Sequence, residues 1–402
     1  MEVAKYKDLS SIFSPYTYLV LMWFSYFLTY IENGFGWGGK FDYYAPDYLH
    51  YFVIFTIVFI LGGIFSTSLS IKNSSYYNEP SIHIVWKFFL IAVIFHVAKF
   101  INIGDIPLLG DPMSRYNLTL GGYEDYPSRL LAPIGIVFFI LYMDGKRFNY
   151  LAYTFICTLL PLLLMQRQEV LILVLGCIMT YLNYKKVSLS NAIFVVFFTS
   201  LVLVFGIAMM TIARYGAENL SDGMSIIEII FWIFHGELTT PIKLGAYADE
   251  LTPNLNGLYT FGSFLSIVIP GFSAHGAELI RTMFTDADTA QSVGSLFGFA
   301  IDFGPIGVGV IGFFTSFISF LFYKKWKESN NLFFAVIYPI IFLQLLWNLR
   351  SGNFLLNPLI IYIILAVYFI ANPLSNEPLD KFVKVIFLLT LPLSFVGLLV
   401  RI

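Results

Sequence analysis

Long apolar runs recur along the whole chain, and they restrict its fold more than any other feature. The sequence is 58% hydrophobic and 12% charged, whereas a soluble domain carries about 25% charged residues. A helix that crosses a bilayer needs about 20 mostly apolar residues. The runs that approach or exceed this length are eleven: 15–31, 49–69, 84–103, 130–143, 148–165, 168–184, 190–212, 294–322, 332–348, 353–370 and 382–400. The sequence therefore predicts an all-α fold, a polytopic transmembrane helical bundle.

The segment between the seventh and eighth runs holds many of the chain's polar groups. We treat 213–293 as one large loop, between an N-terminal bundle of about seven spans at 1–212 and a C-terminal bundle of about four at 294–402. Two weaker apolar runs, 226–239 and 257–270, lie inside this loop. They are compatible with two further spans, with interfacial helices or with a re-entrant pair. We therefore expect about 11–13 spans.

The basic residues are divided unequally between the two sides of the predicted membrane. If the spans alternate, thirteen of the 23 Lys and Arg residues fall on the side of the N-terminus, mostly in short loops. The positive-inside rule makes that side cytoplasmic. The N-terminus is then inside the cell, and the large loop lies outside it.

The two sides also differ in the cation that they carry. The inner side has twelve Lys and one Arg, and the outer side has three Lys and seven Arg. The planar arginine fork binds phosphate through two parallel hydrogen bonds, which lysine cannot do. This division favours an anionic ligand outside, although arginines also extend to membrane interfaces without any ligand. The outer arginines are Arg115, Arg129, Arg167, Arg214, Arg281, Arg350 and Arg401.

Composition argues against several other classes of function. A net charge of −2 gives no support for a nucleic-acid partner. Cys157 and Cys177 lie inside apolar runs, so neither a disulfide framework nor a cysteine metal cluster is expected. Asp286 and Asp288 have metal-ligand character, but the Gly and the terminal Glu of a calcium loop are missing. We expect no metal and no cofactor.

Two polar groups beside apolar runs are candidates for a functional site. Arg167 lies in the turn QRQE between two spans, where an ionisable group is a functional hypothesis by default and a simple polar turn is the alternative. His235 would share one helical face with Glu228 and Trp232. A His beside a carboxylate is a candidate base. The same spacing also fits the wet face of an interfacial helix.

A further set of ionisable residues follows the helix break at the sequence Ile-Pro-Gly. His275, Glu278 and Arg281 come at three-residue spacings, so that neighbours would contact one another on a helix. They are candidates for catalysis, with a structural ion pair as the alternative. Asp302, in the apolar run FGFAIDFGPIG, is also a candidate, because burying an unpaired carboxylate is costly. We expect an outer arginine as the partner of Asp302.

Taken together, these features resemble the bacterial oligosaccharide repeat-unit polymerases, the Wzy-type O-antigen polymerases. About a dozen spans contain one large outer loop in the second half, and a polar turn with an arginine opens a mid-chain span. The run GLYTFGSFLSIVIPG is similar to the family's Ile-Pro stretch, and SLFGFAIDFGPIGVGV to its Asp-Phe-Gly-x-x-Gly start of the next span. The Arg-x10-Gly spacing of some members is absent at Arg167, Arg214 and Arg281.

The resemblance implies a glycosyltransferase with the logic of the C-type membrane enzymes, located in a bacterial inner membrane with the large loop in the periplasm. The donor would be a growing glycan on a polyprenyl diphosphate, and the acceptor a repeat unit on a second carrier lipid. A chain-length regulator protein would be a further partner. The residues that would hold the departing diphosphate are Arg167, Arg214 and Arg281. Those that would act in catalysis are Arg281, His275, Glu278, Asp302 and His235.

Two other functions fit the same topology. An O-antigen ligase uses a similar donor but passes the glycan to the lipid A core. A flippase or other transporter of lipid-linked sugar is not an enzyme, and it should need polar residues within several spans to form a path. The predicted spans here are mostly apolar, and the polar groups gather outside them. This pattern favours the polymerase.

Overall fold

A computed structural model of the chain shows helices and no strands in the residues that it describes. Those residues are 9–34, 48–69, 81–118, 125–145, 147–184, 206, 228, 235–236, 238–245, 257–268, 294–329, 331–350, 357–372, 392 and 394. The all-α prediction is confirmed. The apolar helices also confirm the prediction of a polytopic membrane protein.

Nine of the eleven predicted spans correspond to helices in the described part of the chain. They are α1 (Tyr16–Gly34), α2 (Leu49–Ser68), α3 (Ile82–Ile103), α4 (Leu131–Gly145), α5 (Phe148–Leu163), α6 (Arg167–Tyr184), α11 (Ser295–Glu328), α12 (Leu332–Trp347) and α13 (Pro358–Ala371). The runs 190–212 and 382–400 lie outside the described residues, apart from single positions. The fourth predicted span is short, but the helix η5 (Tyr126–Leu130) precedes α4, and the continuous stretch of 20 residues is long enough to cross a membrane.

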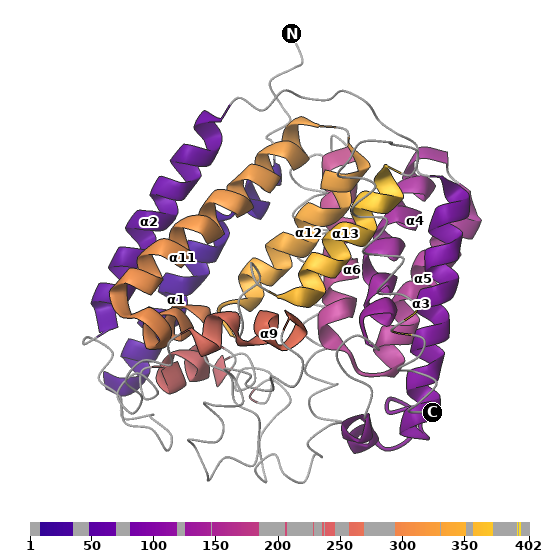
Figure 1. The fold of residues 1–402 in the computed structure, drawn as a ribbon, viewed down its shortest axis with the longest axis horizontal. Coiled ribbons are helices and arrows are strands. Elements are labelled where there is room, and N and C mark those ends of the chain that lie inside the picture. The colour runs from indigo at the N-terminus through magenta and orange to yellow at the C-terminus, as the bar shows by residue number, and fades with distance from the viewer. Residues whose placement is uncertain are drawn as a thin grey trace.

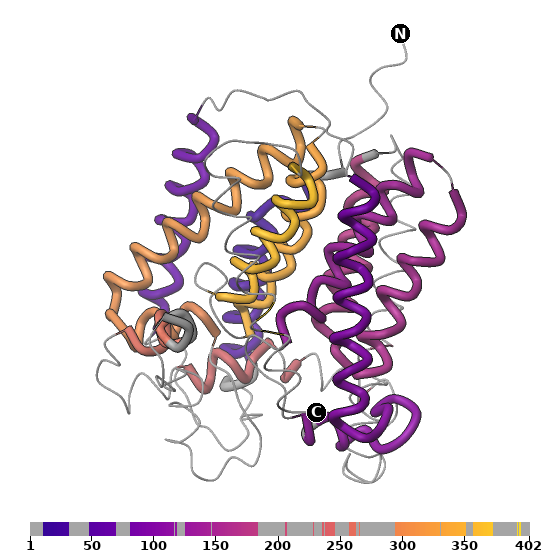
Figure 2. The backbone as a smooth tube through the Cα atoms, turned by 45° about the vertical axis from the view of Figure 1, so that its right-hand side comes forward, coloured from indigo at the N-terminus to yellow at the C-terminus, as the bar shows by residue number. Residues whose placement is uncertain are grey.

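The helices form two groups that are joined through α12 (Figures 1 and 2). In one group α2 packs along α11, and in the other α4 packs against α5 and α6. The α2–α11 contact is close because glycines lie in it: a Cβ added to Gly62 would lie 2.6 Å from the Phe313 carbonyl oxygen. The helix α12 contacts α11, α6, α4 and α13, so its apolar side chains form much of the shared core.

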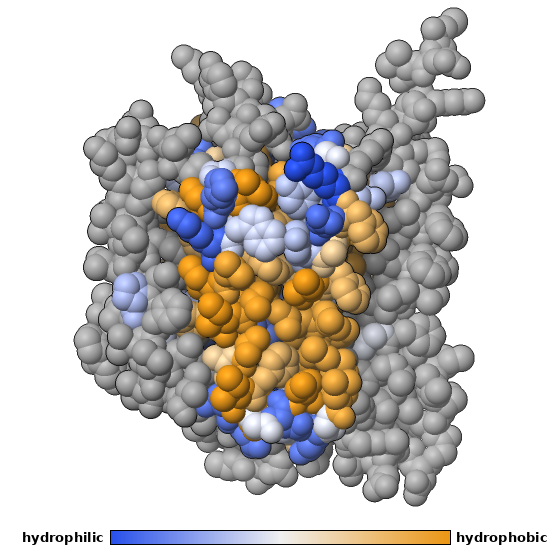
Figure 3. Space-filling model, turned by 90° about the vertical axis from the view of Figure 1, so that its right-hand side faces the viewer, coloured by the Kyte–Doolittle hydropathy of each residue, from blue (hydrophilic) through white to orange (hydrophobic). Residues whose placement is uncertain are grey.

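The surface of the described helices has the polarity of a membrane protein. Figure 3 shows an apolar band between two hydrophilic margins on the side of α3 and α5. Large apolar side chains on these helices point outward, among them Leu90, Ile94, Ile101 and Phe155. A soluble protein rarely exposes so continuous an apolar surface. The band therefore indicates the surface that faces lipid.

The ends of the helices meet as alternating spans require. At one end, the Ser295 amide donates to the Asn348 carbonyl at 2.9 Å, which joins the start of α11 to the end of α12. At the opposite end, Lys324 Nζ donates to the Thr67 carbonyl at 2.9 Å, which joins α11 to the end of α2. We call the first the arginine end, because Arg115, Arg129, Arg167 and Arg350 lie there, and the second the lysine end, because it carries Lys324, Lys325 and Lys327. The arginine end is at the bottom of Figure 1.

A break inside α11 explains why the eighth predicted span is unusually long. Gly304 has φ +59° and ψ −152°, outside the helical region, and Pro305 follows it. Only glycine adopts such a conformation without strain. The residues before the break pack against α9 (Leu258–Val268) at the arginine end. With 11 residues, about 16 Å long, α9 is too short to cross a membrane.

Candidate functional site

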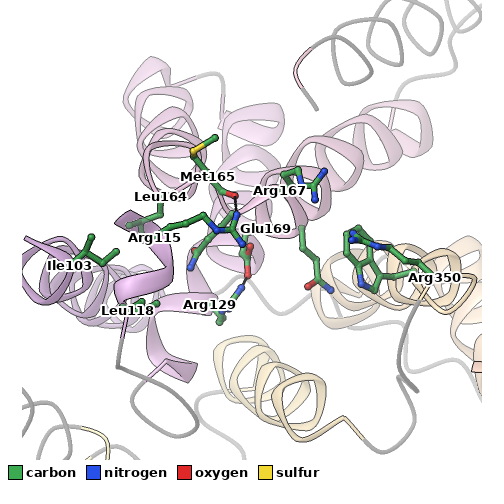
Figure 4. A pocket seen from close by; sticks show the side chains of 12 residues that line it. Ile103, Arg115, Leu118, Arg129, Leu164, Met165, Arg167, Glu169 and Arg350 are labelled. Atoms are coloured by element: carbon green, nitrogen blue, oxygen red, sulfur yellow. Dashed lines mark hydrogen bonds and ion pairs between the residues drawn. The ribbon is translucent and has the colours of Figure 1, made fainter. Parts of the chain in front are cut away.

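A cavity of about 310 Å³ opens at the arginine end, between the ends of α3, α5 and α12 and the start of α6 (Figure 4). Four arginines that come from four separate segments of the chain line it together with one glutamate, which leaves a formal excess of three positive charges. The polar and charged residues that line the cavity are Arg115, Arg129, Gln166, Arg167, Gln168, Glu169 and Arg350. The volume falls at the lower end of the usual range for small-molecule sites, about 300–1,000 Å³.

The turn between α5 and α6 forms one wall of the cavity. Met165 has φ +56°, a conformation that costs a residue with a side chain about 1–2 kcal/mol, and its side chain is fully buried. The Gln166 amide closes the turn by donating to the Pro161 carbonyl at 2.9 Å. Arg167 is the first residue of α6. Its guanidinium therefore adds to the positive end of a helix dipole.

A loop that follows α3 brings Arg115 to the same wall. Asp105 accepts hydrogen bonds from the amides of Asp111 and Ile106, at 2.8 and 2.7 Å, and these bonds hold the pKa of its carboxyl below the usual value. Asp111 in turn caps the helix η3 (Pro112–Asn117), which carries Arg115. Arg115 Nη1 donates to the Met165 carbonyl at 3.2 Å. The loop is thus fastened to the α5–α6 turn.

A connected set of buried and half-buried ion pairs extends from the cavity wall to Lys99 on α3. Lys99, whose side chain is fully buried on α3, pairs with Asp125. Arg129 Nε donates to Asp125 Oδ2 at 2.7 Å, and its Nη1 pairs with Glu169. Burial would raise the pKa of Asp125, but the charges of Lys99 and Arg129 outweigh it and hold the pKa well below its usual value. These ion pairs contain two positive and two negative side chains and are therefore neutral together. The excess positive charge of the cavity belongs to its other three arginines.

Arg350 reaches the cavity from the end of α12. Its guanidinium carbon lies 5.2 Å from the centre of the Trp347 ring, in cation–π geometry, and its amide donates to the Trp347 carbonyl at 2.9 Å. Figure 4 shows Arg115 and Arg129 beside Glu169, with Arg350 approaching from the other side. A ligand in the cavity would therefore lie between Arg350, at the end of α12, and the arginines of the segments around α3–α6.

The structure places only some of the residues that the sequence analysis singled out. Arg167 lines the cavity. His235 is partly buried in a helical segment, and its carbonyl accepts a hydrogen bond from Thr239 Oγ1 at 3.0 Å. Neither His235 nor Asp302 is among the described residues that line the cavity. The candidates that lie outside the described residues are Arg214, His275, Glu278 and Arg281.

Asp302 has a different partner from the one that we expected. Asp302 is 2% exposed, and its carboxylate accepts hydrogen bonds from the backbone amides of Tyr259, at 3.1 Å, and Thr260, at 2.6 Å. These amides belong to the first turn of α9, where backbone N–H groups have no acceptor within the helix. The expectation of an arginine partner was wrong. The start of α9 supplies the hydrogen bonds that the buried carboxylate needs. Asp302 joins α9 to α11.

Sequence reasoning did not select Arg115, Arg129, Arg350 or Glu169 for the site. The unequal division of Arg and Lys between the two sides pointed to all seven outer arginines. It did not indicate which of them lie together around one cavity. Glu169 was noticed only as a neighbour of Arg167. Contacts between distant loops bring these residues together, and no single motif contains them.

Comparison with known proteins agrees with this picture. The model of the family described as "Putative O-antigen polymerase" matches residues 11–363, which is most of the chain. No curated protein matches the chain, and no solved structure does.

Proposed function

Since the chain belongs to the O-antigen polymerase family and so has a role in O-antigen polymerisation, we propose that it transfers a growing glycan from a polyprenyl diphosphate to a lipid-linked repeat unit. The product is O-antigen or a similar surface polysaccharide. The transfer takes place at the periplasmic face of a bacterial inner membrane. A chain-length regulator protein is a proposed partner.

The observation that carries this proposal is the gathering of four arginines around one cavity. Glycosyl transfer from a lipid diphosphate needs cations where negative charge develops as the diphosphate leaves. Arginine forks bind phosphate oxygens in pairs, and the excess of positive charge in the cavity matches an anion. Arg115, Arg167 and Arg350 hold the diphosphate in this proposal, and Arg129, which also lines the cavity, adds to the site while it remains paired with Asp125.

The charges at the two ends of the helices support the proposed orientation of the chain. The lysine end carries Lys324, Lys325 and Lys327 in the last turns of α11, as expected for a cytoplasmic margin. The arginine end then faces the periplasm, where lipid-linked repeat units are joined. In this arrangement the large loop 213–293 lies over the cavity side of the membrane.

The candidate residues that do not line the cavity also have roles in the proposal. Arg214 and Arg281, in the large loop, also bind the diphosphate in this proposal. His275, Glu278 or His235 takes part in catalysis at the acceptor sugar. Asp302 has an anchoring role instead, because both of its oxygens already accept backbone hydrogen bonds at the start of α9. These hydrogen bonds fix α9, which is part of the loop, to the first part of α11.

The glycan pattern of a deletion strain tests the proposed function. Loss of this protein should leave lipopolysaccharide with a single repeat unit, and the parent gene should restore long chains. Free long polymer in the deletion strain would instead indicate a ligase, and absence of any periplasmic repeat unit would indicate a transporter. Complementation with Arg167→Lys should restore little polymer, whereas Arg147→Lys, at an exposed position of the lysine end, should restore it fully.

A further inference from the structure

Glu169 is the acidic residue among the cavity-lining side chains, and binding an anion does not explain its presence. A carboxylate beside a diphosphate site repels the ligand and weakens binding. Its side chain is 6% exposed, and it belongs to the first turn of α6, next to Arg167 and Gln168. A group held at this position by a helix has a defined place in the cavity wall.

Only one of the two carboxylate oxygens of Glu169 is engaged. Oε1 pairs with Arg129, whereas Oε2 is buried and has no hydrogen-bond partner among the described residues. The same is true of Oε1 of Gln166, which also lines the cavity. Buried acceptors without a donor are rare in folded proteins, and each one calls for an explanation such as a ligand.

We propose that Glu169 binds the attacking hydroxyl of the acceptor sugar and accepts its proton, while Gln166 binds a neighbouring hydroxyl. This inference rests on the proposed function. The arginines match the diphosphate, and the two unpartnered oxygens match the hydroxyl groups of a sugar, which are neutral donors. The cavity would then bind the region where the sugar meets the phosphate, rather than the lipid chain.

The shared position of Arg129 allows Glu169 to turn toward the ligand. Arg129 also binds Asp125, so it keeps a carboxylate partner when its bond to Glu169 is exchanged for a phosphate oxygen. The arrival of the donor would thus release the carboxylate that the acceptor needs. This order of events places the base beside the hydroxyl only when a diphosphate is present.

The proposed step is balanced in atoms and charge. The acceptor oxygen forms a bond to the anomeric carbon of the donor, and the bond from that carbon to the diphosphate oxygen breaks. The bonding electron pair leaves with the lipid diphosphate. The hydroxyl proton passes to Glu169 and then to water, and the enzyme returns to its starting state.

The test compares Glu169→Gln and Glu169→Asp with the full-length parent in nanodiscs, using a polyprenyl-diphosphate-linked repeat unit as donor and acceptor. Glu169→Gln should bind the donor at least as tightly as the parent, because a negative charge is lost from the cavity, and transfer should fall about 100-fold or more. Its rate should no longer decline on the acid side of the pH profile. Glu169→Asp, which keeps a displaced carboxylate, should be faster than Glu169→Gln. The exposed carboxylate variant Asp144→Asn serves as the control and should match the parent.

Two outcomes would overturn the inference. One is transfer by Glu169→Gln at the parent rate. The other is an equal loss of donor binding in Glu169→Gln and Glu169→Asp, which would mean that the carboxylate only supports Arg129. Either result leaves the proposed function standing as long as the parent binds donor and forms polymer. A parent protein that binds donor but releases no polymer would instead contradict the proposed function.

Discussion

At the scale of single residues, the pair formed by the fully buried Lys99 and Asp125 should be sensitive to substitution. Asp125→Asn removes the counter-charge of a fully buried ammonium group. Breaking a buried pair in this way costs about 3–5 kcal/mol. We therefore expect a lower melting temperature for Asp125→Asn in detergent. The double variant Lys99→Met with Asp125→Asn should recover much of the loss, and failure to recover would contradict the importance of the pair.

The same carboxylate predicts how stability depends on pH. The folded-state pKa of Asp125 lies below its unfolded value of about 3.9. Its contribution is therefore complete at neutral pH and is lost as pH falls through and below that value. Melting temperature measured between pH 7 and pH 3 should decline less for Asp125→Asn than for the parent. Parallel curves for the two proteins would show that this carboxyl has an ordinary pKa.

The sequence predicted the setting of some residues and missed that of others. Arg167 was found because it is charged and lies between two apolar runs. The partner of Asp302 was not found, because the amides of Tyr259 and Thr260 are present in every chain and carry no side-chain signal. Backbone donors at a helix start become visible only when the helix is placed.

At the scale of elements, the apolar runs predicted nine helices well, since a span is set by local composition. Two features were not predicted from local composition. They are the continuous stretch formed by η5 and α4, and the break in α11 at Gly304. The sequence did signal the break, through Gly-Pro, but a glycine and a proline near the start of a span also fit a loop. The structure shows a break within the helix rather than a loop before it.

Two glycines of α11 should respond differently to alanine, because only Gly298 packs closely against α9. A Cβ at Gly298 would overlap the ring of Tyr259, whereas at Gly309 the nearest atom would lie 3.9 Å away. Gly298→Ala should destabilise the protein by about 1–3 kcal/mol. Gly309→Ala should be neutral or stabilise it by up to about 1 kcal/mol, because alanine favours a helix. Thermal unfolding of both variants provides the measurement, and equal melting temperatures would argue against the α9–α11 contact.

At the scale of the whole molecule, the sequence predicted that arginines and lysines belong to opposite sides but not which loops meet. The cavity requires the turn after α5, the loop after α3 and the end of α12 to come together, and those contacts span more than 180 positions of the chain. Packing between distant helices decides them, and a single sequence carries little information about it.

The proposed orientation can be checked by labelling one introduced cysteine at a time with a membrane-impermeant maleimide on intact cells. Arg281→Cys, in the large loop, should react from outside, and Lys327→Cys, at the lysine end, should react only after the membrane is opened. The parent protein measures the background from Cys157 and Cys177. Reaction of both variants from the same side would contradict the orientation.

The central claim is that the arginines of the cavity hold the lipid diphosphate. The most direct measurement is the dissociation constant of a polyprenyl diphosphate for the protein in nanodiscs, compared with Arg115→Lys, Arg167→Lys, Arg350→Lys and the lysine-end control Arg147→Lys. Each cavity variant should bind roughly tenfold to 100-fold more weakly, since a paired, charge-assisted hydrogen bond contributes about 1.5–3 kcal/mol. The control should bind as the parent does. Parent-like binding by all three cavity variants, at a normal melting temperature, would contradict the claim.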